Sequence, residues 1–250
     1  MKKLLLVILL IWGCNSDHQS FTEPPTTAMD DFNDVTYLNG FLYTTNYDYS
    51  EGPGPRIFLY GMSPDGALVD RIDLSMNSQG FIFMTNDGQS IFGLCTPGPG
   101  LLAQWNSVGE RQKLQSWDWP TQWAPGGIFF QADRSLAFVM FTQQHSVNIT
   151  SLWELQNGEF VQSDTSRLAF AGASPIAATA DSAGSVYILG EMPSGQRFVR
   201  QFVDLMPHAD WLLTDSTITG ITWADTALIA LSRDRYIQRI PTVNWTPVSN

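Results

Sequence analysis

The chain has 250 residues, with 24 Asp and Glu against 13 Lys and Arg, and so a formal net charge of −11 at pH 7. A chain this acidic lacks the basic surface that nucleic-acid-binding proteins need, and we expect anionic lipid surfaces to repel it. The 44% share of apolar residues is ample for a packed core, and the length fits one domain or two.

The chain opens on a segment typical of a signal peptide. Lys2 and Lys3 precede nine consecutive apolar residues, Leu4–Trp12. A helix that crosses a bilayer needs about 20 such residues, so this run is too short for a membrane span and suits a cleaved signal. We therefore predict a signal peptide over residues 1–13. The alternatives are a secretory signal cut elsewhere and a short uncleaved anchor.

The end of this segment, Ile11-Trp12-Gly13-Cys14, resembles the bacterial lipobox, in which a small residue precedes a cysteine. Trp12 departs from the pattern, which usually has a small residue there. The resemblance covers the first 14 residues and implies that Cys14 carries diacylglycerol. It thus implies an anchor to a membrane of the bacterial cell envelope, and Asn15 in place of an aspartate implies the outer membrane rather than the inner one.

The chain has two cysteines, Cys14 and Cys95. If Cys14 carries lipid, Cys95 has no partner within the chain, and its position in the apolar stretch SIFGLCT predicts a buried thiol. The alternative is a disulfide between Cys14 and Cys95.

After residue 14 the sequence consists of short apolar or alternating runs separated by Gly, Pro, Asn and Asp, which predicts an all-β protein. One type of strand recurs five times, with its first core residue at Leu42, Ile91, Leu136, Val186 and Leu228. The spacings are 49, 45, 50 and 42 residues. Each of these strands follows an apolar strand, predicted at residues 34–38, 80–85, 127–132, 175–180 and 219–224.

A third strand follows in every unit and a more polar fourth strand in four of them, so the repeat resembles a β-propeller blade. We predict a five-bladed β-propeller of four-stranded antiparallel blades over residues 31–250. The fifth unit lacks its outer strand. We expect residues 14–30 to serve as a lipid tether and, through Ser20–Thr22 or Thr26–Met29, to complete the last blade and close the ring.

No cofactor or metal is expected from the sequence. The three histidines, His18, His145 and His208, are scattered without the spacing of metal ligands. The chain has no G-x-S-x-G nucleophile motif and no phosphate-binding loop.

Candidate catalytic residues come only from the resemblance to five-bladed propellers, several of which are glycoside hydrolases with carboxylates at the mouth of the channel. Such enzymes need an acid and a base or nucleophile on either side of the scissile bond. The candidates here are Asp34, Asp87 and Glu191, near the ends of inner strands or in their loops. The alternative is that these acids are ordinary turn residues.

Aromatic residues are the candidates for ligand binding. Trp117, Trp119 and Trp123 lie in the connection SWDWPTQW between the second and third units, and Tyr47 and Tyr49 lie in a long loop of the first. Aromatic faces stack on sugars, but the tryptophans could equally cap the apolar layer between two blades. We expect a non-catalytic module that binds or scaffolds a protein or glycan, with a glycan-active enzyme as the alternative.

Overall fold

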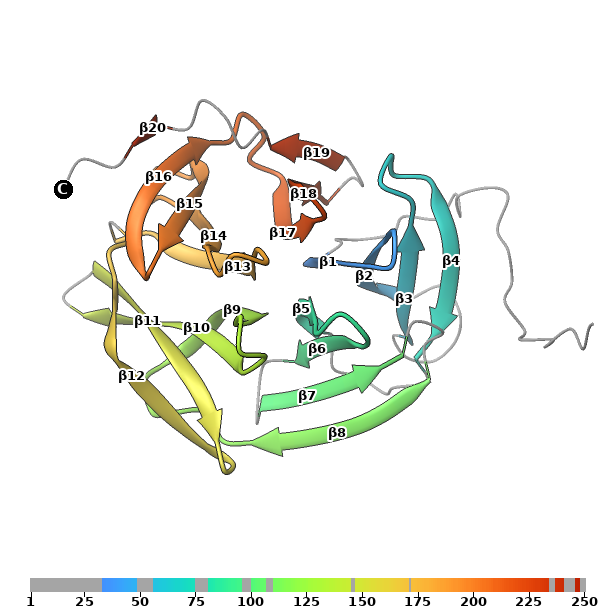
Figure 1. Cartoon of the computed structure of the whole chain (residues 1–250), viewed down its shortest axis with the longest axis horizontal. Coiled ribbons are helices and arrows are strands. Elements are labelled where there is room, and N and C mark those ends of the chain that lie inside the picture. Colours follow the sequence, from blue (N-terminus) through green and yellow to red (C-terminus); the bar gives the residue numbers. More distant parts are fainter. Residues whose placement is uncertain are drawn as a thin grey trace, which may run out of the picture.

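The structure is a computed structural model that describes residues 33–48, 56–74, 81–95, 100–106, 110–144, 147–170, 172–233, 237–240 and 246–247. Five small antiparallel sheets surround a central axis as the blades of a β-propeller (Figure 1). The predicted all-β, five-bladed fold is therefore confirmed. The predictions on residues 1–32, including the signal peptide, Cys14 and the ring-closing segment, lie outside the described residues.

Each blade is a meander whose strands follow one another outward from the axis (Figure 1). The first three blades are β1 (Val35–Leu38), β2 (Phe41–Asp48), β3 (Arg56–Met62) and β4 (Leu68–Asp73); β5 (Phe81–Asn86), β6 (Ile91–Cys95), β7 (Gly100–Trp105) and β8 (Arg111–Trp117); and β9 (Ala124–Phe130), β10 (Leu136–Gln144), β11 (Val147–Gln156) and β12 (Glu159–Leu168). The fourth has β13 (Ser174–Ala180), β14 (Val186–Glu191), β15 (Arg197–Val203) and β16 (Met206–Leu212), and the fifth has β17 (Ile218–Ala224), β18 (Ala227–Ser232) and β19 (Ile237–Ile240).

Apolar contacts between neighbouring blades hold the ring together. The described residues form five buried apolar clusters, one at each of the five blade interfaces. The inner strands have neighbours on both sides, which explains their nearly continuous apolar sequences. The interface between the fifth and first blades joins Val35 and Leu42 to Ile229 and Leu231, so the ring closes through a core like the others.

The two ends of the described chain contribute differently to closure. Strand β1 contacts β17 of the last blade, where the Tyr37 amide donates to Thr222 Oγ1 at 3.1 Å. The fifth blade has three strands among the described residues, which agrees with the prediction that the fifth unit lacks its outer strand. The short strand β20 (Thr246–Pro247) pairs instead with β16, as a fifth strand at the outer edge of the fourth blade.

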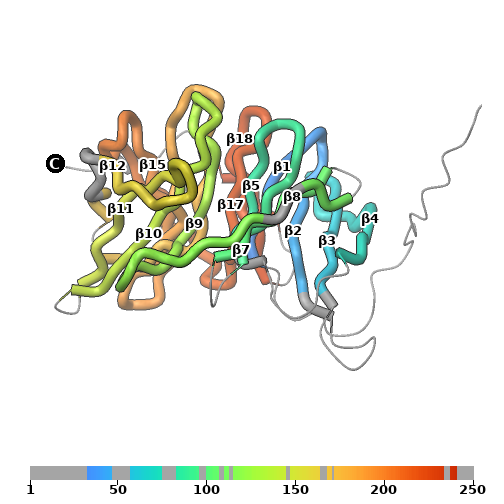
Figure 2. Tube along the Cα trace, turned by 90° about the horizontal axis from the view of Figure 1, so that it is seen from below, coloured from blue at the N-terminus to red at the C-terminus, as the bar shows by residue number. Residues whose placement is uncertain are grey.

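The ring has two distinct faces. Figure 2 shows it edge-on, with the inner strands β5, β9 and β17 crossing its thickness. We call the face where inner strands begin the mouth face, and the face where they turn into the second strand the turn face. The turns carry Asp87, Asp133 and Asp181, each of which accepts one or two backbone amides of its own turn. These acids fix the hairpins between first and second strands.

No helix in the described part of the chain is long and apolar enough to span a bilayer. Cys95 is fully buried between the first and second blades, as predicted from its apolar stretch. Burial raises the pKa of this thiol to about 11.

Candidate functional site

A cavity of about 230 Å³ opens on the mouth face. It lies where the fourth, fifth and first blades meet, because its lining comes from the segment before β1, from the starts of β13, β15 and β17, from the end of β14, and from the residue after β18. The lining residues are Asn33, Ser174, Ile176, Glu191, Arg197, Thr219 and Arg233. We refer to this as the mouth cavity.

An ion pair between neighbouring strands forms one wall of the mouth cavity. Glu191 ends β14 and lies opposite Arg197, the first residue of β15, across the hairpin. Arg197 Nε donates to Glu191 Oε2 at 3.0 Å. The Arg197 side chain is 11% exposed, whereas that of Glu191 is 41% exposed, so the carboxylate is the more accessible partner.

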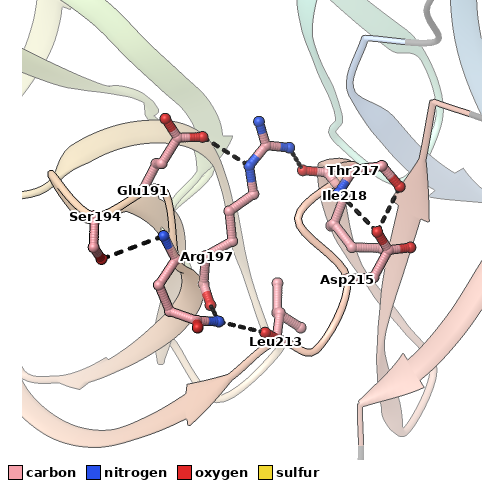
Figure 3. A network of polar contacts seen from close by, with 8 residues as sticks. Glu191, Ser194, Arg197, Leu213, Asp215, Thr217 and Ile218 are labelled. Atoms are coloured by element: carbon pink, nitrogen blue, oxygen red, sulfur yellow. Dashed lines mark hydrogen bonds and ion pairs between the residues drawn. The ribbon is translucent and has the colours of Figure 1, made fainter.

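Arg197 also joins the fourth blade to the fifth. Its Nη1 donates to the backbone carbonyl of Ile218, the first residue of β17 (Figure 3). The segment before β17 is held in place by Asp215, whose Oδ1 accepts the amide of Thr217 at 2.7 Å and its hydroxyl at 2.6 Å (Figure 3). The guanidinium is therefore fixed on two sides, by a carboxylate of its own blade and by a backbone carbonyl of the next blade.

Arg233 supplies the second cation of the mouth cavity. It follows β18 directly, and its amide donates to the carbonyl of Thr217 at 3.1 Å. This bond holds the backbone of Arg233 beside the start of β17, and the residue as a whole is exposed to solvent. Two arginines thus reach the cavity from two blades.

Asp34 lies directly before β1 but does not face the cavity, because it is completely buried. Its carboxylate accepts the amides of Val35 at 2.8 Å and Met84 at 3.0 Å, and a backbone hydrogen bond from Ile221. Burial raises the pKa of Asp34 well above its ordinary value, against the lowering effect of these amides. Asp34 therefore links the first, second and fifth blades.

The close approach at Asp34 depends on Gly220 in β17. A Cβ atom at this position would lie 2.7 Å from both Cα and Oδ1 of Asp34, so any side chain would displace the backbone of the first blade. Gly220 thereby permits the tight contact that buries Asp34.

The structure does not bring the three predicted carboxylates together. Glu191 lines the mouth cavity, and Asp34 is buried one residue after the lining residue Asn33. Asp87 lies at the turn face, where its Oδ1 accepts the amides of Gln89 at 2.9 Å and Ser90 at 2.7 Å. Its position and bonds are those of the turn residue given as the alternative in the sequence analysis.

The three tryptophans pack into the interface between the second and third blades. Trp117 is 8% exposed and meets Phe138 edge to face, with ring centroids 5.7 Å apart. Trp119 stacks on Phe160 at 5.4 Å, and Trp123 meets Trp153 at 5.3 Å. This packing agrees with the alternative in the sequence analysis, in which the tryptophans cap the apolar layer between two blades. A role of the tryptophans in ligand binding stays a prediction.

The structure does not test the two tyrosine candidates. The backbone of Tyr47 belongs to β2, but its side chain and all of Tyr49 lie outside the described residues. Within the described residues no three His, Cys, Asp or Glu side chains gather closely enough to hold a metal ion.

Sequence reasoning missed Arg197 and Arg233. Neither belongs to a motif, and they are 36 positions apart (233 minus 197), so only the meeting of two blades places them in one cavity. One signal could have found them. Each arginine directly follows a predicted strand or turn, and cations are scarce in a chain with 13 Lys and Arg.

Comparisons with known proteins support the fold and leave the family open. No family model matches the chain, and no curated protein matches it. One similar solved structure is a GH43 glycoside hydrolase engineered to display both endo-xylanase and exo-arabinofuranosidase activity, with a TM-score of 0.51 and 12% identity. The match covers 92% of this chain and 54% of that one, so the chain spans about half the length of the solved protein. At this identity the similarity shows the five-bladed fold alone.

Proposed function

We propose that the protein is a non-catalytic glycan-binding module, which a lipid on Cys14 attaches to the bacterial cell envelope and which holds its ligand in the mouth cavity. The observation that carries this proposal is the composition of the cavity wall. Six of its seven lining residues bear amide, hydroxyl, carboxylate or guanidinium groups, which can hydrogen bond to sugar hydroxyls. Ile176 is the one apolar residue of the lining.

The carboxylates support binding rather than cleavage. Glycoside hydrolysis requires two carboxyl groups that face the scissile bond from either side. Among the described residues of the cavity lining, Glu191 alone carries a carboxylate, and Arg197 holds it in an ion pair. Asp34 has no exposed surface from which to reach a sugar.

A glycan-active enzyme is the second candidate, because a solved protein of the same fold displays endo-xylanase and exo-arabinofuranosidase activity. That protein and this chain share the ring architecture, in which the mouth of the ring is a natural place for a ligand. The likeness supports glycans as the ligand class, while the arrangement of carboxylates supports binding over hydrolysis.

The test is a comparison of binding and cleavage on the same oligosaccharides. We expect at least one class of oligosaccharide to bind in calorimetry and to be recovered intact after prolonged incubation. Glu191→Ala should weaken this binding, whereas the control Asp87→Ala at the turn face should not. Shortened products that disappear in Glu191→Gln would establish the hydrolase instead.

A further inference from the structure

The described lining of the mouth cavity holds more arginines than carboxylates, unlike the protein as a whole. Among the described lining residues, two arginines, Arg197 and Arg233, stand against one carboxylate, that of Glu191. The whole chain carries −11. Such a cavity attracts an anionic group that the rest of the surface repels.

Arg197 is oriented to receive such a group. Two of its three guanidinium nitrogens are held by Glu191 and by the Ile218 carbonyl, and Figure 3 shows the remaining terminal nitrogen directed away from both partners. A guanidinium fixed in one orientation loses little entropy on binding, and its planar donors match the geometry of a carboxylate.

The lining disfavours recognition of a neutral sugar by stacking. None of the described lining residues is aromatic, so the cavity lacks the flat apolar surface on which sugar rings usually rest. Its volume of about 230 Å³ lies below the range of about 300–1,000 Å³ of ordinary ligand pockets, which suits a single sugar unit. Polar groups and charge must then supply the specificity.

We infer that the sugar unit in the mouth cavity carries a carboxylate, so that the ligand is a uronic-acid glycan whose carboxylate pairs with Arg197 and Arg233. This inference rests on the proposed function, since it names the class of glycan that the same cavity takes. Glu191 then accepts hydrogen bonds from hydroxyl groups of the same ring and opposes the ligand's charge.

The experiment compares trigalacturonate with its fully methyl-esterified form, which keeps the same rings and loses the negative charges. Calorimetric titrations of the full chain at low and high salt measure both ligands. We expect trigalacturonate to bind about tenfold more tightly than the ester, as suits a charge-assisted contact, and to lose affinity as salt rises.

Two variants test the assignment of the charges in opposite directions. Arg233→Gln should weaken trigalacturonate about threefold, and Glu191→Gln should strengthen it about threefold, as suits exposed charges in contact. A purely structural role of either side chain would not produce this reversal of sign. The matched control Arg111→Gln removes the same charge from the exposed outer strand β8 and should leave the affinity unchanged.

The outcomes separate this inference from the proposed function. Equal affinity for acid and ester, with loss of binding in Glu191→Ala, would overturn the carboxylate and leave the glycan-binding cavity standing. Binding of neutral xylo-oligosaccharides in preference to trigalacturonate would have the same meaning. Failure of every one of these oligosaccharides to bind would overturn both.

Discussion

The removal of the Asp34 carboxylate tests how the ring closes. Asp34→Ala leaves the amides of Val35, Met84 and Ile221 without their acceptor in a fully buried place. A buried donor without a partner costs about 1–3 kcal/mol, so three donors cost about 3 kcal/mol even at the low end of that range. For a domain of this size, that loss lowers Tm by about 6–12 °C.

Thermal unfolding followed by circular dichroism measures this effect. The matched control is Asp133→Ala, which removes an exposed aspartate whose Oδ1 accepts the amide of Ser135 in the turn between β9 and β10. Water can replace that bond, so the control should lose about 1 kcal/mol or less. A Tm of Asp34→Ala within about 2 °C of the wild type would refute the role of Asp34 as a link between three blades.

The same residue makes a prediction about pH. Burial raises the pKa of Asp34 in the folded state, so its contribution to stability is present below the unfolded pKa of about 3.9 and is lost as pH rises through the folded pKa. Asp34→Asn stays neutral at every pH and lacks this loss. Urea unfolding of the two proteins should therefore show the stability difference shifting in favour of Asp34→Asn between about pH 4 and pH 7. A shift in favour of the wild type would contradict the buried carboxyl.

Three further predictions concern residues outside the mouth cavity. Because burial raises the pKa of Cys95 to about 11, a disulfide reagent at pH 8 should label this thiol only after unfolding, and rapid labelling of the native protein would contradict its place in the core. Trp117→Ala should cost about 3–5 kcal/mol in the free energy of unfolding and leave glycan affinity unchanged, whereas a folded variant with lost affinity would show that the tryptophans bind ligand. Cys14→Ser should release the protein from membranes and abolish acyl labelling, and a variant that keeps both would rule out the lipid anchor.

The strands were predictable because the same pattern of apolar strands and turn residues recurs in every blade. Each inner strand is apolar on both faces and is separated from the next strand by turn residues, and the repeat of about 46 residues follows from equal blades. A further signal went unused: Asp87, Asp133, Asp181 and Asp225 recur at spacings of 46, 48 and 44 in the turns after four inner strands. The pairing of β20 with β16 was not predictable, since two residues carry no pattern.

The mouth cavity was only partly predictable, because it depends on contacts between blades. Glu191 was a candidate from its position at the end of a strand, but its ion pair with Arg197 depends on the hairpin register. The apolar strand at residues 34–38 was predicted, but the sequence does not show that the Asp34 side chain itself is buried. Its burial depends on Gly220, 186 positions away (220 minus 34), where the absence of a side chain lets two blades meet.

The most direct test of a non-catalytic glycan-binding cavity is to equilibrate the protein with neutral and acidic oligosaccharides, isolate the complex, and weigh the released sugars by mass spectrometry. We predict that an oligosaccharide is retained by the wild type, is recovered at its original mass, and is lost from the Glu191→Ala, Arg233→Gln double variant. Retention that survives in the double variant, or sugars recovered as shorter products, would contradict the account.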